Sequence, residues 1–267
     1  MESTLPQTTP APAALPRTSS RVELLGLLAG LAIFALGQII LRHLYIDDAW
    51  ISFRYAKHWG EGLGPVYNVD GTHVEGYTNF LWVALLAGLH RLGLPVPETA
   101  KVLGGLLGAG AIVLLWGLPR RFGLPQRLPA TALLVGLSGL MATACAQGLE
   151  TALLIFLMVL LLTVLPGEAE TRVAWRSALV LLALALTRPD GLLCLPVAVF
   201  VLLLLAIARP ERRKALLGNA ALLLVVVGAG VAAHMLWRHA FYGDWLPNTF
   251  YAKAGPLTAR TLPGMML

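Results

Sequence analysis

The stretch RVELLGLLAGLAIFALGQIILR, residues 21–42, contains one charged residue, Glu23, between its two terminal arginines. A helix needs about 20 mainly apolar residues to cross the hydrocarbon core of a bilayer. A secretory signal peptide has a shorter apolar core and a cleavage site with small residues. We therefore expect residues 22–41 to form an uncleaved first membrane helix.

The composition of the whole chain agrees with this expectation. The 267 residues are 57% hydrophobic and 13% charged, and their mean hydropathy is +0.74. Soluble domains are about 45–50% apolar and about 25% charged. The net charge of +6 comes from short basic clusters between apolar runs, a pattern that orients membrane proteins and does not indicate a nucleic-acid partner. The predicted fold class is all-α, a polytopic membrane helix bundle.

Seven further apolar runs follow, separated by Pro, Gly or charged residues: 80–94, 99–118, 128–146, 149–165, 173–187, 192–208 and 215–237. Residues 1–20 are rich in Pro, Thr, Ala and Ser and are expected to be a disordered cytosolic tail. Residues 21–236 form the predicted transmembrane module. Residues 237–267 are expected to be an outer loop in which the chain is truncated.

Two basic clusters predict the topology. They are Arg120, Arg121 and Arg127, and Arg209, Arg212, Arg213 and Lys214. Cytoplasmic loops collect Lys and Arg, so both clusters belong inside and residues 42–79 form a long first outer loop. One run between 79 and 120 must then fail to cross. Residues 80–94 are only 15 long and contain His90 and Arg91, so we expect an interfacial or re-entrant helix there and seven crossings. The alternative is eight crossings, with one loop that breaks the charge rule.

This topology places four polar segments on the outer face: 42–79, 147–150, 188–191 and the residues from 238 onward. Within the first of them, residues 46–59 are expected to form an amphipathic helix, because Ile51, Tyr55 and Trp59 recur at a spacing of four. The topology follows from the basic clusters alone, yet it also places most acidic and aromatic residues outside the apolar runs on one side. We therefore expect a site at the outer boundary between membrane and water.

The candidate catalytic residues are Asp47 and Asp48, directly after the first helix. Such carboxylates can act as a general base or hold a divalent cation, and an aspartate can equally cap a helix. No cofactor is required by the residues, and any metal ion would be bound by Asp47 or Asp48. The candidate substrate-binding residues are polar and aromatic side chains of the four outer segments: Arg54, Tyr55, Glu75, Tyr77, Thr78, Asn79, Glu150, Arg188, Asp190, Asp244, Trp245, Asn248 and Lys253.

Six short motifs occur in a characteristic order: DDAWISFRYA at 47–56, EGLG at 61–64, VEGYTNFLW at 74–82, GLETAL at 148–153, TRPDG at 187–191 and YGDWLPNTFYAK at 242–253. Together they resemble a family of bacterial multi-spanning glycosyltransferases with the GT-C fold. The terminal arabinofuranosyltransferases of mycobacterial-type cell walls are similar, and protein O-mannosyltransferases and aminoarabinose transferases are similar at a greater distance.

The resemblance implies an enzyme of the bacterial cytoplasmic membrane. Such enzymes transfer a sugar from a polyprenyl-phosphate carrier to a glycan, lipid or protein acceptor on the extracytoplasmic face. The catalytic residue of the family is an acid in the first outer loop, here Asp47 or Asp48, and the resemblance favours Asp47. Arg54, Arg188 and Lys253 are candidates to offset charge on the departing phosphate. Family members continue with further helices, so we expect little activity from this chain alone.

Two other readings remain open. A transporter or flippase for a lipid-linked sugar would also carry polar residues in its membrane helices, but near the bilayer centre. The candidate residues here lie at the ends of the apolar runs, which favours an enzyme. A membrane scaffold without catalytic activity, including an inactive truncated protein, is the third reading, and the density of acidic and aromatic residues in 42–79 argues against it.

Overall fold

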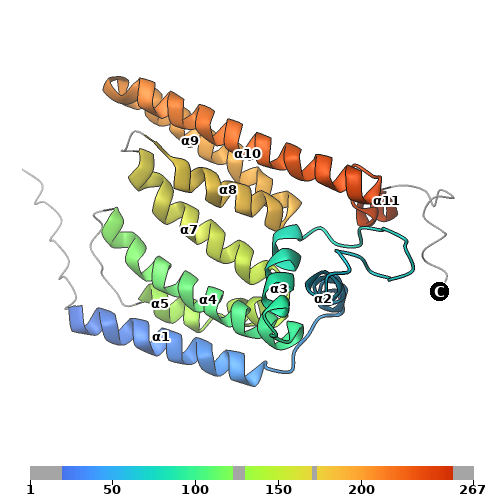
Figure 1. Ribbon diagram of the computed structural model, residues 1–267. Helices are drawn as coiled ribbons and strands as arrows, with labels where there is room; N and C mark the ends of the chain where they lie inside the picture. The colour runs from blue at the N-terminus through green and yellow to red at the C-terminus, as the bar shows by residue number, and fades with distance from the viewer. Residues whose placement is uncertain (1–19, 123–129, 170–172, 255–267) are drawn as a thin grey trace, which may run out of the picture.

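The computed structural model describes residues 20–122, 130–169 and 173–254, and these residues form helices and no strands (Figure 1). The predicted tail and the last part of the predicted outer loop lie outside the described residues. The elements are α1 Ser20–Ile40, α2 Asp47–Gly60, α3 Phe80–Arg91, α4 Val96–Arg121, α5 Ala130–Gly136, α6 Gly139–Ala146, α7 Thr151–Ala169, α8 Trp175–Thr187, η1 Pro189–Leu193, α9 Cys194–Ala208, η2 Pro210–Arg212, α10 Arg213–Tyr242 and α11 Asn248–Ala254.

Five helical segments are long and apolar enough to cross a membrane: Arg21–Ile40, Val96–Arg121, Thr151–Ala169, Pro189–Ala208 and Pro210–Tyr242. They confirm the prediction of a helical membrane protein with several spanning helices. The expected first helix is the first of these segments. The apolar helices α3 and α8 are shorter, at 12 and 13 residues.

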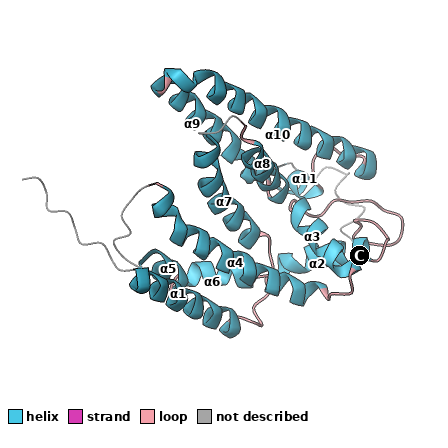
Figure 2. Ribbon diagram, turned by 60° about the vertical axis from the view of Figure 1, so that its left-hand side comes forward, coloured by secondary structure: helices cyan, strands magenta, loops and turns pink. Residues whose placement is uncertain are grey.

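Hydropathy alone indicates one continuous helix over the apolar run 128–146, but the structure has two. Within its described part, α5 ends at Gly136 and α6 begins at Gly139, and both lie beside α1 (Figure 2). The side chain of Ser138 caps α6 by accepting a hydrogen bond from the backbone N–H of Met141 at 3.3 Å. A Cβ atom on Gly136 would lie 2.3 Å from the carbonyl oxygen of Gly30 in α1, so this close approach requires glycine.

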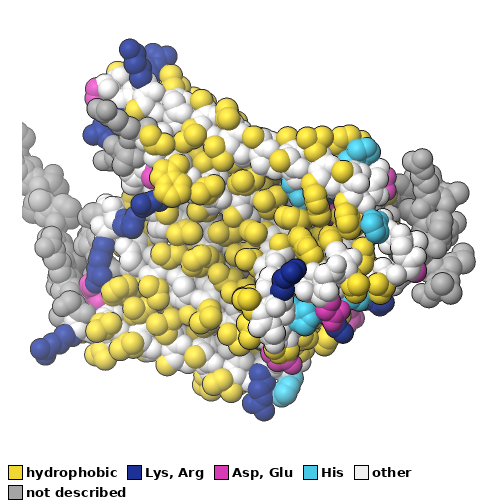
Figure 3. Space-filling view, viewed as in Figure 1, with side chains coloured by type: hydrophobic (Ala, Val, Ile, Leu, Met, Phe, Trp, Pro, Cys, Tyr) yellow, Lys and Arg dark blue, Asp and Glu magenta, His cyan; other side chains and the backbone are white. Residues whose placement is uncertain are grey.

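Both predicted basic clusters lie at one end of the bundle, as far as they are described; Arg127 falls outside the described residues. Arg120 at the end of α4 forms an ion pair of 2.5 Å with Glu23 at the start of α1. The neighbouring Arg121 lines a cavity together with Arg209 and Arg212 from the turn between α9 and α10. Figure 3 shows Lys and Arg side chains along this left-hand edge beside some acidic ones, whereas the His side chains gather at the right together with Asp, Glu and further Lys and Arg side chains. We call the left-hand end the basic end and the right-hand end the polar end.

The polar end is held together by Lys101, in the first turns of α4. Its ammonium group donates hydrogen bonds to the carbonyl oxygens of Leu41, Leu44 and Ala146, which follow or end α1 and α6. A cation is favourable at a helix C-terminus because the last carbonyl groups have no partner within the helix. Lys101 also lies 4.1 Å from the centre of the Tyr45 ring. One side chain therefore fixes the polar ends of three helices.

Helix α2 forms where the amphipathic pattern predicts it, and it packs against α3 at the polar end (Figure 2). Tyr55 is fully buried, but Ile51 and Trp59 are only half-buried, so the buried face is rotated from the predicted stripe. In α3, Trp82 is fully buried and donates from Nε1 to the carbonyl oxygen of Gly148 at 3.1 Å. This contact joins α3 to the segment before α7.

Candidate functional site

A chain of polar side chains joins three of the predicted outer segments. Asn79, just before α3, donates from Nδ2 to Ser52 Oγ at 3.0 Å and to Glu150 Oε2 at 2.7 Å. Glu150 Oε1 lies 3.5 Å from a guanidinium nitrogen of Arg188, whose Nε donates to Asp190 at 2.9 Å. Asn79, Glu150, Arg188 and Asp190 are all residues singled out from the sequence, and the structure brings them into one network.

The side chains of this network become more exposed to solvent from Ser52 to Asp190. Ser52, Asn79 and Glu150 are buried, the side chain of Arg188 is 38% exposed, and that of Asp190 is 54% exposed. The ionised network carries two carboxylates and one guanidinium. At its exposed edge, Arg188 and Asp190 offer both N–H donors and acceptor oxygens, which suits hydroxyl groups.

A second polar pair, Glu75 and Arg238, joins the first loop to the end of α10. Both residues are buried, and Arg238 Nε lies 2.7 Å from Glu75 Oε2. The N–H group does not point along this line, so the contact is an ion pair and not an aligned hydrogen bond. Burial raises the pKa of the Glu75 carboxyl to about 7, because the loss of hydration outweighs the guanidinium of Arg238. Glu75 thus exchanges its proton near neutral pH.

The tyrosines of this region hold the first loop in place. Tyr55 donates from its hydroxyl to the carbonyl oxygen of Val74 at 2.5 Å and accepts from the N–H of Gly76 at 2.8 Å. The hydroxyl of Tyr77 lies 3.3 Å from that of Tyr242, and the Tyr242 hydroxyl donates to the carbonyl oxygen of Pro65 at 2.6 Å. Burial raises the pKa of Tyr55 to about 12 and that of Tyr77 further. The hydroxyls of Tyr55 and Tyr77 position the loop around Glu75. That these two residues also bind substrate stays a prediction.

Asp47 and Asp48 lie in the first turn of α2, and both are exposed. The residue at the N-cap position is Ile46, whose N–H donates to the carbonyl oxygen of Gln147 at 3.4 Å. The two acids therefore do not cap the helix, although their charge is favourable at its N-terminus. Asp48 precedes Ser52 by four residues and so shares a helix face with it. This spacing places Asp48 on the side of the network.

The remaining predicted residues surround this core. Arg54 is exposed, donates to Asn68 at 3.1 Å and lies over the ring of Tyr67. Thr78 is half-buried, Asp244 is exposed, and the backbone N–H of Asn248 donates to the carbonyl oxygen of Glu75 at 3.0 Å. Trp245 is half-exposed and stacks on His239 with ring centres 4.2 Å apart. The side chain of Lys253 lies outside the described part of the chain.

Ser52, Arg238 and Tyr242 belong to the site but were not among the predicted site residues. Ser52 could have been found from its spacing to Asp48. Arg238 directly follows the last apolar run and was assigned to the outer loop, whereas α10 continues through it to Tyr242. A charged residue within an apolar helix indicates a buried partner, and that signal points to Arg238.

Aromatic rings cover one side of the polar end. Trp237 stacks on Trp59 and Phe241, with ring centres 6.4 and 5.8 Å apart, and Phe241 stacks on His73 at 4.4 Å. The face of an aromatic ring suits both a sugar ring and the lipid headgroup region. These rings come from α2, the first loop and α10, and the last two of these also contain Glu75 and Arg238.

Within the described residues, no group of three or more His, Cys, Asp or Glu side chains is placed to hold a metal ion. Comparison of the chain with protein-family models, with curated proteins and with solved structures found no match.

Proposed function

We propose that this protein is a glycosyltransferase of the bacterial cytoplasmic membrane that resembles GT-C enzymes. It would transfer a sugar from a polyprenyl phosphate to a glycan, lipid or protein acceptor outside the membrane. The observation that carries the proposal is the polar network from Ser52 to Asp190, assembled from three separate segments at the ends of apolar helices. A polyprenyl phosphate keeps its tail in the hydrocarbon and presents its sugar–phosphate bond at that depth.

A seven-crossing arrangement fits the course of the chain. The segments α1, α4, α5–α6, α7, α8, α9 and α10 alternate between the basic and polar ends, whereas α3 stays at the polar end (Figure 1). The pair α5–α6 is broken, but it packs on α1 and α4, which cover its backbone from lipid. Because Lys and Arg mark the cytoplasmic side, the polar end faces outward.

The orientation can be tested with single cysteines. Cys145 and Cys194 are replaced by alanine, and one cysteine is introduced at Asp70 or at Arg212, both of which are exposed. A thiol reagent that does not cross membranes should label the Asp70 variant in intact cells and label the Arg212 variant only after permeabilisation. Labelling at Arg212 in intact cells contradicts the arrangement.

The proposed chemistry assigns an acid to the acceptor. Asp48 or Asp47 takes the proton of the acceptor hydroxyl as its oxygen attacks the anomeric carbon, and the bond from that carbon to the phosphate breaks. The helix spacing favours Asp48, because it shares a face with Ser52. Arg188 is already opposed by Glu150 and Asp190, so it orients a hydroxyl-rich sugar more readily than it offsets a phosphate. The exposed Arg54 is better suited to the phosphate.

A flippase or transporter for a lipid-linked sugar is the competing function. Its polar groups should lie mid-helix near the bilayer centre. Among the described residues, Glu150 precedes the first turn of α7 and Arg188 follows the last turn of α8, so both lie at helix ends. This placement favours transfer chemistry at the boundary over transport through the bundle.

The deciding experiment measures transfer of a labelled sugar from polyprenyl phosphate in membranes that contain the protein. In a complete version of the enzyme, we expect transfer with the wild type and a loss of at least about 100-fold with Glu150→Gln, which keeps the shape of the side chain but removes its charge. Asp70→Asn is the control, because Asp70 is an exposed acid of the first loop and does not belong to the network. Equal transfer by both variants contradicts the proposed site, and translocation of the labelled lipid without transfer favours the competing function.

A further inference from the structure

Lys101 of α4 is bound to both of the chain segments that lead into the proposed site. Its ammonium group donates to the carbonyl oxygens of Leu41, at 3.2 Å, and of Leu44, both in the link from α1 to α2. It also donates to the carbonyl oxygen of Ala146, the last residue of α6. One side chain therefore holds two segments that lie far apart in the sequence.

Each of the two segments continues directly into an acid of the proposed site. Asp48, in the first turn of α2, follows Leu44 by four residues. Glu150, in the polar network, follows Ala146 by four residues. Four residues span at most about 13–14 Å even when fully extended. Both acids are therefore tethered within a short distance of the same ammonium group.

The two segments also contact each other beside Lys101. The N–H of Ile46 donates to the carbonyl oxygen of Gln147 at 3.4 Å. A Cβ atom on Gly148 would lie 3.4 Å from the ring of Tyr45, and its φ of +82° also favours glycine. The same Tyr45 ring lies 4.1 Å from the ammonium group of Lys101. The segments are thus packed closely where Lys101 binds them.

The chemistry of the ammonium group suits this task. The last carbonyl groups of α1 and α6 have no partner within their helices, and a cation is favourable there. Helices α1, α4 and α6 contact one another, so a side chain of α4 reaches both of the other helix ends (Figure 2). An ammonium group has three N–H donors, and the three carbonyl oxygens use all of them. Lys101 therefore acts on the backbone and leaves substrate to its neighbours.

We propose that Lys101 is a positioning residue for glycosyl transfer, which places Asp48 against the network that contains Glu150. This role rests on the proposed function, in which Asp48 takes the proton of the acceptor hydroxyl while the network orients the sugar. Misplacement of a reacting group by about 1 Å can cost about 10²-fold in rate. Lys101 fixes that placement through the link before α2 and the end of α6.

The alternative role of Lys101 is a purely structural cap. Loss of such a cap lowers the amount of folded protein but leaves the rate of each folded molecule unchanged. A positioning residue differs in two ways. Its loss lowers kcat with little change in the KM for the donor, and the loss depends on whether Asp48 is present.

A double-mutant cycle in a complete version of the enzyme separates the two roles. Lys101→Met should lower kcat for transfer from labelled polyprenyl-phosphate sugar at least about 10-fold, per folded molecule. In the Asp48→Asn background the same change should lower kcat about threefold or less, because the placement of an absent base no longer matters. An equal loss in both backgrounds overturns the positioning role. If Lys101→Met does not accumulate, the cycle uses Lys101→Arg, which keeps the charge but moves the donor atoms.

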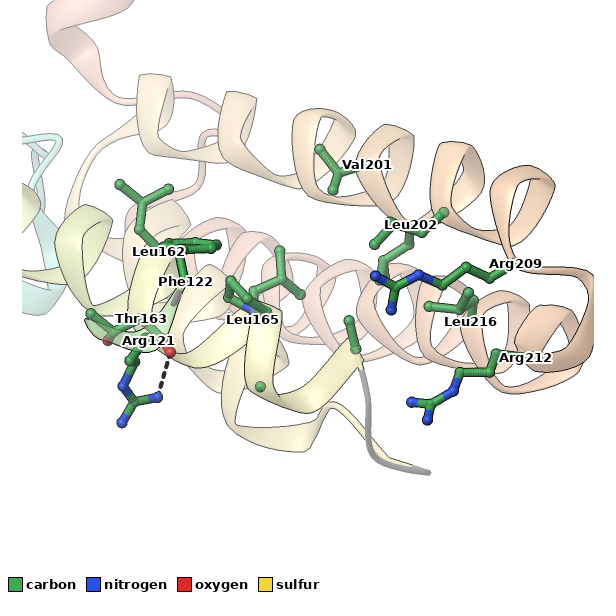
Figure 4. A pocket seen from close by; sticks show the side chains of 14 residues that line it. Arg121, Phe122, Leu162, Thr163, Leu165, Val201, Leu202, Arg209, Arg212 and Leu216 are labelled. Atoms are coloured by element: carbon green, nitrogen blue, oxygen red, sulfur yellow. Dashed lines mark hydrogen bonds between the residues drawn. The ribbon is translucent and has the colours of Figure 1, made fainter. Parts of the chain in front are cut away.

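The matched control is Arg121→Met at the other end of the same helix. Arg121 ends α4 and donates from Nη1 to the carbonyl oxygen of Thr163 in α7 at 2.7 Å (Figure 4). This contact is of the same kind, a cation bound to a helix carbonyl, but it lies at the basic end. Arg121→Met should keep the wild-type kcat. A loss equal to that of Lys101→Met overturns the proposal.

Amide hydrogen exchange of the purified chain in detergent tests the placement without an activity. In Lys101→Met, the amides of residues 41–50 and 146–150 should exchange at least about 10-fold faster than in the wild type. Arg121→Met should leave both segments unchanged. Wild-type exchange in the Lys101 variant, together with wild-type transfer, overturns the positioning role alone. Absence of transfer by the wild-type enzyme overturns the proposed function and this role with it.

Discussion

The two ends of this helix bundle differ in whether their polar and charged side chains are buried and paired or exposed to solvent. At the polar end, Asn79, Glu150 and Arg238 are buried and bound by residues far away in the sequence. At the basic end, Arg209 and Arg212 are exposed in one short turn. A buried polar group without its partner is costly, whereas an exposed one remains hydrated. The polar end should therefore be sensitive to single substitutions in both activity and stability, and the basic end should tolerate them.

The largest difference between the ends should be in activity. Asp48→Asn, made in a complete version of the enzyme, should lower sugar transfer by about 10²–10⁴-fold, because it removes the proposed general base. Asp47→Asn, at the neighbouring position, should have the smaller effect of the two. The measurement is the initial rate of transfer from labelled polyprenyl-phosphate sugar, normalised to the protein in the membrane.

Arg213→Gln at the basic end serves as the control for the acids, and its transfer rate should equal that of the wild type. If both acid variants keep near-wild-type rates, the catalytic assignment is wrong. If both variants instead fail to accumulate, the acids have a structural role at the start of α2.

The next largest effect concerns stability. Glu75→Leu leaves the guanidinium of Arg238, which stays charged, buried without its carboxylate and should lower the free energy of unfolding by about 3–5 kcal/mol. Replacing both residues, as in Arg238→Met/Glu75→Leu, should recover most of this loss, because no charge remains buried. Arg213→Met at the basic end should change stability by less than about 0.5 kcal/mol, because Arg213 is exposed. The thermal unfolding midpoint in detergent measures all three, and an equal loss at the two ends contradicts the comparison.

A smaller effect should appear as a pH dependence specific to the polar end. The pKa of Glu75 is raised to about 7 in the folded protein from a usual value of 4.5. Between these two values the folded state holds the proton more tightly than the unfolded state. Stability should therefore fall as the pH rises from about 4.5 to about 7.

The contribution of this carboxyl is isolated by comparing unfolding midpoints across that pH range. Glu75→Gln does not titrate, so its midpoint should depend less on pH than that of the wild type. Parallel pH profiles for the two proteins exclude a raised pKa at Glu75.

The smallest predicted effect is at Ser52. Ser52→Ala removes one partner of Asn79 but leaves the hydrogen bond from Asn79 to Glu150 intact. The expected loss of stability is about 1 kcal/mol. Asn79→Leu removes the hydrogen bonds to both Ser52 and Glu150 and should lower the stability clearly more. A lower unfolding midpoint for Ser52→Ala than for Asn79→Leu would show that Asn79 is not the centre of the network.

The sequence was most informative where the physical rule is local. Hydropathy located the first helix, and the charge rule grouped the four polar segments that the structure brings together at one end. The run 128–146 was read as continuous because its break depends on the contact of Gly136 with Gly30 in another helix. Hydropathy along one segment contains no information about such a contact.

Only part of the candidate site could be predicted, because sequence rules apply to neighbouring residues and not to pairs that are distant in the sequence. Glu150, Asn79 and Arg188 were identified by residue type and by their position at the ends of apolar runs. Their pairing was not predicted, nor was the pairing of Glu75 with Arg238, since each pair joins residues that are distant in the sequence. The positioning role of Tyr55 was missed because an aromatic residue near a membrane boundary suits an interface and a core equally well.

The break between α5 and α6 has a consequence for how the protein is made. Neither helix, at 7 and 8 residues, is long enough to enter a bilayer by itself. The backbone groups between them need protein neighbours before they face lipid, and those neighbours are α1 and α4. During synthesis, α1 must therefore remain beside the insertion site until α4 and the broken pair emerge. A substitution at Gly30 that prevents the close approach should consequently stall insertion at this stage, long before any active site exists.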